Sequence, residues 1–139
     1  MTQKSVNDRR IFILATAATA ATCAINPIAG AAPVSNYPKL AHHVFFWLKN
    51  ADSKDDLEAL FKGLKTLTQI ETVRGAHFGV PASTEKRDVV DNSWSASEIL
   101  FFDDTAGQKV YQDHPVHQKF VADCSRLWER VVVYDVISR

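Results

Sequence analysis

The residues with the clearest chemical potential lie in one short block, Tyr111-Gln112-Asp113-His114-Pro115-Val116-His117. Proline is favoured in the first turn of a helix, so Pro115 predicts a helix start with His117 in its first turn. The positive end of a helix disfavours a protonated imidazole. A neutral histidine can act as a general base near pH 7, and a tyrosine hydroxyl can donate to a developing oxyanion. The block therefore indicates acid–base chemistry by His117 and Tyr111.

Histidine and tyrosine in these positions also have structural uses, which leaves a second interpretation open. A histidine at a helix start can serve as a cap, and a buried tyrosine often has its hydroxyl satisfied within the core. A third candidate, His43, lies in a strand-like segment, and we expect it to point into the same space as Tyr111 and His117. We take these three residues as the catalytic candidates.

The spacing of the histidines does not favour a metal site. His114 and His117 are three residues apart with Pro115 between them, so they do not clearly share a helical face. His42 and His43 are adjacent in a strand, where neighbouring side chains point to opposite faces. The sequence has no Cys-x-x-Cys or His-Glu-x-x-His motif. We expect no metal and no resident cofactor.

The elements that must hold the block alternate between strand and helix patterns. Runs of aromatic and β-branched residues predict strands at residues 41–48, 74–80, 97–102 and 131–137. A capping pattern at Ser53 and Asp56 predicts one helix, and further helices are expected from Thr105 and from Pro115. The order β-α-β-β-α-β is the ferredoxin-like α+β arrangement, a four-stranded antiparallel sheet with helices on one face.

Two helices are expected to bury one apolar stripe each, because apolar residues recur at helical spacing. The stripe of the first helix contains Leu57, Leu60, Phe61, Leu64 and Leu67. The stripe of the last helix contains Val116, Phe120, Val121, Cys124, Leu127 and Trp128.

Two of the strands are apolar on both faces, although helices can cover only one face of the sheet. In the first strand His43, Phe45 and Trp47 point one way while the alternate apolar residues point the other way, and residues 131–137 are nearly all apolar. Large exposed apolar patches mark interfaces, so a second copy of the sheet is the expected cover. We therefore expect a homodimer with the open sheet faces packed together; a ligand cleft in a monomer is the alternative.

The first 31 residues resemble an export signal. Arg9 and Arg10 precede an uncharged segment rich in Ala and Thr, and Ala29-Gly30-Ala31 is a small-residue cleavage site. The arginine pair favours the twin-arginine type and a periplasmic or secreted location. Residues 32–40 are then a lead-in and residues 41–139 the domain. We expect no stable membrane insertion after cleavage; a signal retained as an anchor is the alternative.

Composition bounds the remaining classes of function. The 139 residues suit one domain, and 46% of them are hydrophobic. With 16 Lys+Arg and 16 Asp+Glu the formal net charge is zero. Because no basic excess is available to neutralise phosphates, nucleic-acid binding is not expected.

From residue 40 onward the sequence resembles the stress-responsive α/β-barrel (Dabb) family of the dimeric α+β barrel superfamily. The resemblance lies in the block Tyr111 with His114-Pro115-x-His117-x-x-Phe120, supported by several weaker matches. These are His43-Val44, Val73-Arg74-Gly75, Phe78-Gly79, Phe102 and Tyr134-Asp135. It implies a dimeric barrel built from two four-stranded sheets.

The resemblance also implies a possible activity. Plant polyketide cyclases of the family catalyse an aldol condensation without a cofactor, and their acid–base pair corresponds to Tyr111 and His117. We expect an apolar barrel pocket for a small carbonyl compound, with ligand contacts from His114, Trp47, Phe78 and Phe120. Two alternatives stay open: a non-catalytic binding or stress-associated structural dimer, and a haem-binding or monooxygenase-like protein with His114, His117 or His43 as axial ligand.

Overall fold

The structure is a computed structural model that describes residues 38–139. The predicted signal residues Arg9, Arg10, Ala29 and Ala31 lie outside this range, so export stays a prediction.

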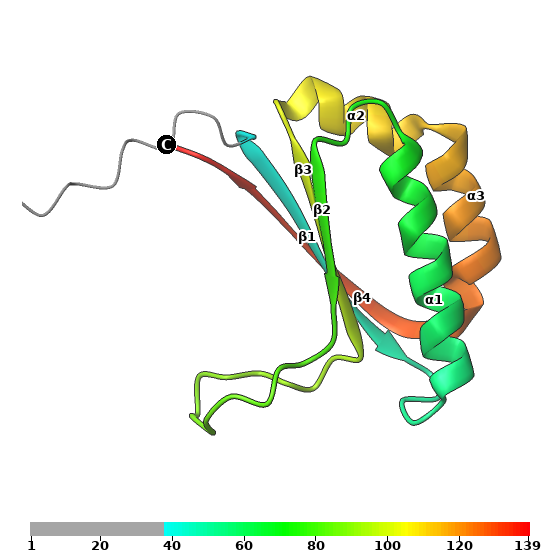
Figure 1. Ribbon diagram of the computed structural model, residues 1–139, viewed down its shortest axis with the longest axis vertical. Coiled ribbons are helices and arrows are strands. Elements are labelled where there is room, and N and C mark those ends of the chain that lie inside the picture. Colours follow the sequence, from blue (N-terminus) through cyan, green and yellow to red (C-terminus); the bar gives the residue numbers. More distant parts are fainter. Residues whose placement is uncertain (1–37) are drawn as a thin grey trace, which may run out of the picture. The chain divides into compact units, whose positions relative to one another are not determined.

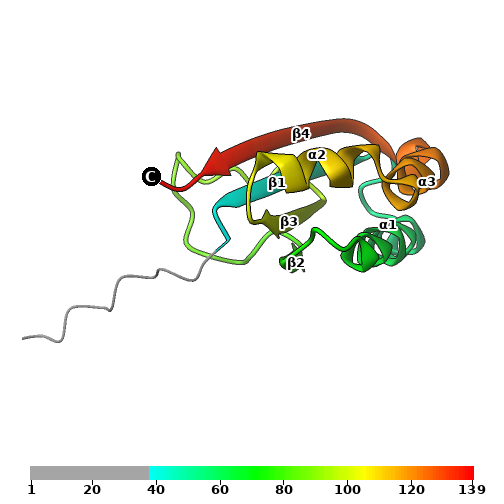
Figure 2. The ribbon, with the colours of Figure 1, turned by 90° about the horizontal axis from the view of Figure 1, so that it is seen from above.

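The described chain forms a four-stranded antiparallel sheet with helices on one side (Figure 1; Figure 2). The elements run β1 (Leu40–Leu48), α1 (Lys54–Thr66), β2 (Gly75–Gly79), β3 (Ala96–Phe102), α2 (Thr105–Asp113), α3 (Pro115–Cys124) and β4 (Trp128–Ile137). Short 3-10 turns follow α1 and α3. The strand order β2-β3-β1-β4 places β1 and β3 in the middle of the sheet. This is the expected ferredoxin-like fold.

Strand β1 shows why the sheet has two distinct faces. Its residues alternate between buried and half-buried along all nine positions. Leu40, His42, Val44, Phe46 and Leu48 are buried against the helices. The intervening side chains point to the open face, because side chains in a strand alternate between faces.

The helices cover the buried face of the sheet through apolar stripes. In α1 the buried residues are Leu60 and Leu64, and the N-cap Ser53 accepts a hydrogen bond from the Asp56 amide at 3.1 Å. In α3 Phe120 and Cys124 are buried, whereas Val121 is 39% exposed. The expectation that Val121 belongs to the buried stripe was wrong, because Phe120 and Cys124, one turn apart, make the contact with Gly63 of α1, and Val121 lies to the side of them on the helix surface. No helix among residues 38–139 is long and apolar enough to cross a membrane.

The contact between α1 and α3 depends on the absence of a side chain at Gly63. A Cβ atom built there would lie 2.6 Å from Cys124 Sγ and 3.0 Å from Phe120 Cδ2. Gly63→Ala is therefore expected to lower the free energy of unfolding by about 1–3 kcal/mol through overpacking. The matched control is Gly107→Ala in α2, whose Cβ would find ordinary contacts at 3.5 Å or more. That change is expected to stabilise by about 0.5–1 kcal/mol. Urea denaturation measures the free energy of unfolding of both variants. Equal changes in the two would contradict the close contact at Gly63.

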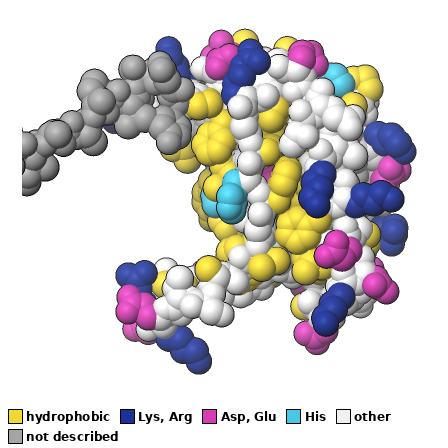
Figure 3. Space-filling view, viewed as in Figure 1, with side chains coloured by type: hydrophobic (Ala, Val, Ile, Leu, Met, Phe, Trp, Pro, Cys, Tyr) yellow, Lys and Arg dark blue, Asp and Glu magenta, His cyan; other side chains and the backbone are white. Residues whose placement is uncertain are grey.

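The open face of the sheet is partly covered by the loop of residues 80–95. This loop projects on the side of the sheet away from α1 and α3 (Figure 1). It is attached by a hydrogen bond from the Ser95 amide to the Phe46 carbonyl at 2.8 Å and by one from Trp47 Nε1 to Ser93 Oγ at 3.1 Å. Charged side chains gather over the helices and the loop tip, whereas hydrophobic side chains gather along the sheet (Figure 3).

Candidate functional site

The junction of α2 and α3 positions the histidine block. His114 ends α2 and caps α3: its amide donates to the Tyr111 carbonyl, and its Nδ1 accepts from the Val116 amide at 3.1 Å. Pro115 takes the first helical position, where its missing N–H costs nothing. His114 Nε2 also lies 3.5 Å from Glu71 Oε2. His114, expected to contact a ligand, therefore has both ring nitrogens engaged within the fold.

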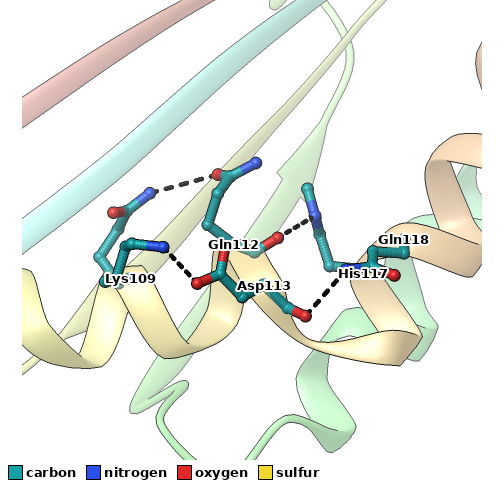
Figure 4. A network of polar contacts seen from close by, with 6 residues as sticks. Lys109, Gln112, Asp113, His117 and Gln118 are labelled. Carbon is teal, nitrogen blue, oxygen red and sulfur yellow. Dashed lines mark hydrogen bonds and ion pairs between the residues drawn. The ribbon is translucent and has the colours of Figure 1, made fainter.

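His117 lies in the first turn of α3, and its tautomer is determined by one contact. Its Nδ1 lies 3.0 Å from the backbone carbonyl of Gln112 (Figure 4). A carbonyl oxygen can only accept, so Nδ1 must carry the proton and Nε2 of the neutral ring presents a lone pair. Burial lowers the pKa of His117; the Gln112 carbonyl opposes this shift, and positive charge on His42 adds to it. The imidazole is thus held neutral at pH 7, with Nε2 free as a base.

Tyr111 lies beside this imidazole and is 1% exposed. The centroids of the Tyr111 and His117 rings are 4.7 Å apart, and Tyr111 also contacts Phe102 at 5.2 Å. Burial raises the pKa of Tyr111 well above its usual value, and negative charge on Glu98 and Asp135 adds to the shift. The phenol therefore stays protonated and is available as a hydrogen-bond donor.

His42, and not His43, faces Tyr111. The His42 and Tyr111 rings contact each other edge to face with centroids 5.6 Å apart. His42 Nδ1 donates to Asp135 Oδ1 of β4 at 2.7 Å, because the two residues are directly paired across the sheet. The expectation that His43 shares this space was wrong: His43 points to the opposite face, where it stacks on Phe45 at 4.1 Å.

A buried carboxyl group completes the interior side of this site. Glu98 of β3 is 2% exposed and lies on the helix-facing side of the sheet, opposite Val44 of β1 and Phe78 of β2. Its Oε2 is buried and has no hydrogen-bond partner among the described residues. Burial raises the pKa of Glu98 to about 8. Glu98 is therefore a neutral carboxylic acid at pH 7.

The remaining candidates divide between the two faces of the sheet. Phe78 and Phe120 pack on the helix side, where Phe78 borders the core and Phe120 lies 5.8 Å from the ring of Trp128. Trp47 lies on the open face and holds the Arg130 guanidinium over its ring at 4.2 Å. The structure thus brings Tyr111 and His117 together and separates them from His43 and Trp47, which lie on the open face.

The open face has a hollow of its own. It measures about 170 Å³ and is lined by Phe45, Trp47, Asp91, Trp94 and Tyr134. Trp94 of the covering loop contacts Phe45 at 5.2 Å, and Tyr134 contacts the same ring at 6.1 Å.

Two residues of the site, His42 and Glu98, were missed at the level of sequence. Strand alternation was the signal for both. His42 shares its face with Val44 and Phe46, and Glu98 shares its face with Leu100 and Phe102. A polar residue that shares a strand face with apolar residues is expected to be buried and to have a functional role. Among residues 38–139 no cluster of three potential metal-ligating side chains is present.

Comparison with known proteins places this geometry in a family. The family model described as the Stress Responsive A/B Barrel Domain, or Dabb, matches residues 40–138, which is most of the chain. The chain belongs to the Dabb family. The match contains the whole Tyr111–His117 block and every strand of the sheet. No curated protein sequence matches this Dabb chain.

Solved structures similar to the Dabb domain share its fold. A Dabb family protein with a ferredoxin-like fold from Mesorhizobium loti is 24% identical, with a TM-score of 0.60 over 73% of this chain and 98% of that one. A dimeric ferredoxin-like protein of unknown function from Thermobifida fusca is 18% identical, with a TM-score of 0.60 over 74% and 93%. A hydroxynitrile lyase from Passiflora edulis is 18% identical, with a TM-score of 0.61 over 73% and 95%.

Proposed function

We propose that this Dabb domain catalyses cofactor-free acid–base chemistry on a small, apolar carbonyl compound, with His117 as the base and Tyr111 as the oxyanion donor. The observation that carries the proposal is the hydrogen bond from His117 Nδ1 to the Gln112 carbonyl. It holds a neutral imidazole with its Nε2 lone pair free, beside a phenol that stays protonated. A base and an oxyanion donor in a largely apolar interior are the parts that proton abstraction next to a carbonyl requires.

The reaction proceeds through an enolate. His117 Nε2 takes a proton from the carbon next to the carbonyl, and the C–H electron pair forms the new C=C bond while the carbonyl π pair moves to oxygen. The Tyr111 hydroxyl donates a hydrogen bond to that oxygen. The enolate carbon then attacks a second carbonyl carbon, as in an aldol reaction, and the proton on His117 passes to the new alkoxide. His42, oriented by Asp135, lies against the Tyr111 ring and positions it.

The test is deuterium exchange at the carbon next to a carbonyl, which requires only the first step. The protein is incubated in D₂O with 4-phenyl-2-butanone, and deuterium incorporation is followed by NMR. Exchange above the rate in buffer is expected. Exchange equal to that in buffer across a panel of aliphatic and aromatic ketones would contradict the proposal and favour a binding or structural role.

A second reaction class is favoured by one structural neighbour, which is named a hydroxynitrile lyase. Cleavage of a hydroxynitrile needs a base to take the hydroxyl proton while the carbon–cyanide bond breaks and cyanide leaves with the electron pair. His117 Nε2 is suited to that step as well. Mandelonitrile, with benzaldehyde formation followed by absorbance, separates this reaction from ketone exchange.

We further propose that the protein is a homodimer in which the two open sheet faces meet. Tyr134 and Val136 of β4 are each 58% exposed on that face, next to the half-buried Phe45 and Trp47. An exposed apolar surface of this kind marks an interface. Similar structures described as dimeric and ferredoxin-like support this arrangement. In such a dimer the aromatic hollow lies between the two sheets.

A buried charge at this face is expected to separate the protomers. Val136→Asp should weaken the dimer at least about tenfold, since an unpaired charge in an apolar interface costs more than 1.4 kcal/mol. Val121→Asp on α3, where the valine is 39% exposed, is the matched control. Sedimentation velocity across a range of concentrations checks both variants. A Val136→Asp dimer as tight as the control would exclude this face as the interface.

Export by the N-terminal 31 residues is also a proposal. The arginine pair Arg9-Arg10 and the Ala29-Gly30-Ala31 site carry it. Mass spectrometry of the protein from the exported fraction of its host tests it; a chain that begins at Ala32 is the expected result.

A further inference from the structure

Glu98 is a buried polar residue whose carboxyl group is not required for the packing of the core. It lies in the middle of β3, a central strand, and points into the layer between the sheet and the helices. Its neighbours on that face of β3 are Ala96 and Leu100, both fully buried. A hydrophobic residue of similar size would satisfy the packing, so the carboxyl group costs stability that the core does not recover.

The buried oxygen of Glu98 has no hydrogen-bond partner among residues 38–139. Buried polar atoms are nearly always hydrogen-bonded, and an orphaned one marks a functional site or a position for a bound group. This carboxyl is 2% exposed, so it cannot turn to bulk solvent for a partner. Its unused hydrogen-bonding capacity is therefore directed into the interior.

The chemical groups around this carboxyl are those of the proposed site. Glu98 is paired with Val44 of β1, two residues from His42 on the same face of the sheet. The His42 ring in turn contacts Tyr111, with centroids 5.6 Å apart. Four elements contribute titratable side chains to this layer, and two contribute apolar ones. The titratable residues are His42 of β1, Asp135 of β4, Tyr111 of α2 and His117 of α3. The apolar residues are Phe78 of β2 and Leu60 and Leu64 of α1. None of these groups forms an ion pair with Glu98 that would hold it ionised.

We infer that Glu98 is a second catalytic donor that hydrogen-bonds the same ligand oxygen as Tyr111. A carboxylic acid in an apolar site can donate a hydrogen bond next to a tyrosine and so stabilise an enolate oxygen. The proton stays on Glu98 while His117 removes the one on carbon. This inference rests on the proposed function for its substrate class, a small carbonyl compound.

The direct test observes Glu98 itself. The protein is labelled with ¹³C at the glutamate carboxyl, and the Glu98 signal is assigned by its loss in Glu98→Gln. Addition of 4-phenyl-2-butanone is expected to shift this signal and to raise its titration midpoint, because the ketone oxygen binds the protonated form. A Glu98 signal that does not respond to saturating ketone overturns the inference.

Two variants separate donation from packing. Glu98→Leu should bind the ketone about tenfold more weakly, the effect of one lost hydrogen bond to a polar ligand atom. Glu98→Gln keeps a donor, so it should bind at pH 7 much as the parent does. The parent should lose affinity as the pH rises through about 8, whereas Glu98→Gln should not. Equal affinity of Glu98→Leu and the parent, or an unchanged alkaline loss in Glu98→Gln, overturns the inference.

Failure of the inference and failure of the proposed function give different results. If the Glu98 signal responds to ketone but no deuterium exchange occurs, the proposed chemistry is wrong and Glu98 is a ligand-binding donor. If exchange occurs and depends on His117 while Glu98→Leu exchanges as fast as the parent, the chemistry stands and the role of Glu98 does not.

Discussion

Replacement of His117 by alanine is expected to lower the rate of deuterium exchange into 4-phenyl-2-butanone by about 10²- to 10⁴-fold, the usual contribution of a positioned general base. The physical reason is the loss of Nε2, the ring nitrogen that the hydrogen bond from Nδ1 to the Gln112 carbonyl leaves free. The fold should survive, because His117 is only half-buried and the cap of α3 is provided by His114. NMR of the exchanging ketone measures the rate.

The matched control for this change is His77→Ala. His77 is exposed on β2 and lies on the open face, opposite Ile99. Its loss should leave exchange within error of the parent. Equal rates for His117→Ala and the parent would exclude His117 as the base, whatever the control does.

The pH dependence of exchange follows from the same imidazole. Burial lowers the pKa of His117, so the neutral, base-competent form is already dominant below pH 6.5. The rate should therefore rise with pH along an acid limb whose midpoint lies below pH 6.5. An acid limb centred above pH 7 would show that a different group is the base.

Glu98→Gln is expected to remove a pH-dependent loss of stability of about 3–4 kcal/mol between pH 5 and pH 8, at about 1.4 kcal/mol for each unit of pKa shift. The Glu98 carboxyl has a pKa of 4.5 in the unfolded chain and about 8 in the folded one. Between these values the folded state binds more protons than the unfolded state. The free energy of unfolding therefore falls as the pH rises, and it levels off above pH 8.

The difference between the parent and Glu98→Gln isolates this contribution. His43 and His117 have lowered pKa values, so their contribution runs the other way and rises with pH up to about 6.5. It is common to both proteins and cancels in the difference. Urea denaturation at pH 5, 6.5 and 8, at one protomer concentration, provides the measurement. Glu58→Gln on the exposed side of α1 is the control. A parent and Glu98→Gln that differ equally at all three pH values would contradict the buried, neutral carboxyl.

Local patterns in the sequence were sufficient for the order of the helices and strands. The prediction that Trp128 belongs to the last helix was wrong, because α3 ends at Cys124 and β4 already begins at Trp128. Ser53 was recognised as the cap of α1 because the capping interaction spans three residues, and Pro115 marked the start of α3 for the same local reason. The stripe at Leu60 and Leu64 follows from helical spacing alone. The prediction that Val121 is buried was wrong, because helical spacing gives the direction of the apolar face but not how much of that face a neighbouring helix covers.

The choice between His42 and His43 shows where such patterns stop. Strand alternation placed the two rings on opposite faces, and that is observed. Both faces of the strand are apolar, with Phe45 on the face of His43 and Phe46 on the face of His42, so hydrophobicity does not say which face the helices cover. The covered face is determined by the side of the sheet on which the helices pack, and Tyr111 of α2 packs on the side of His42.

The sequence by itself was therefore enough to determine the order of the elements, the ferredoxin-like fold, the family and the Tyr111–His117 block, because each depends on residues close together in the chain or on a recognisable motif. The hydrogen bond by which Asp135 orients His42 joins residues 93 positions apart and exists only in the folded sheet. The burial of Glu98 without a hydrogen-bond partner among residues 38–139 likewise arises only in the folded structure. Burial and the pKa shifts that burial causes belong to positions in space, and the electrostatics of this site exist only once sheet and helices close over it.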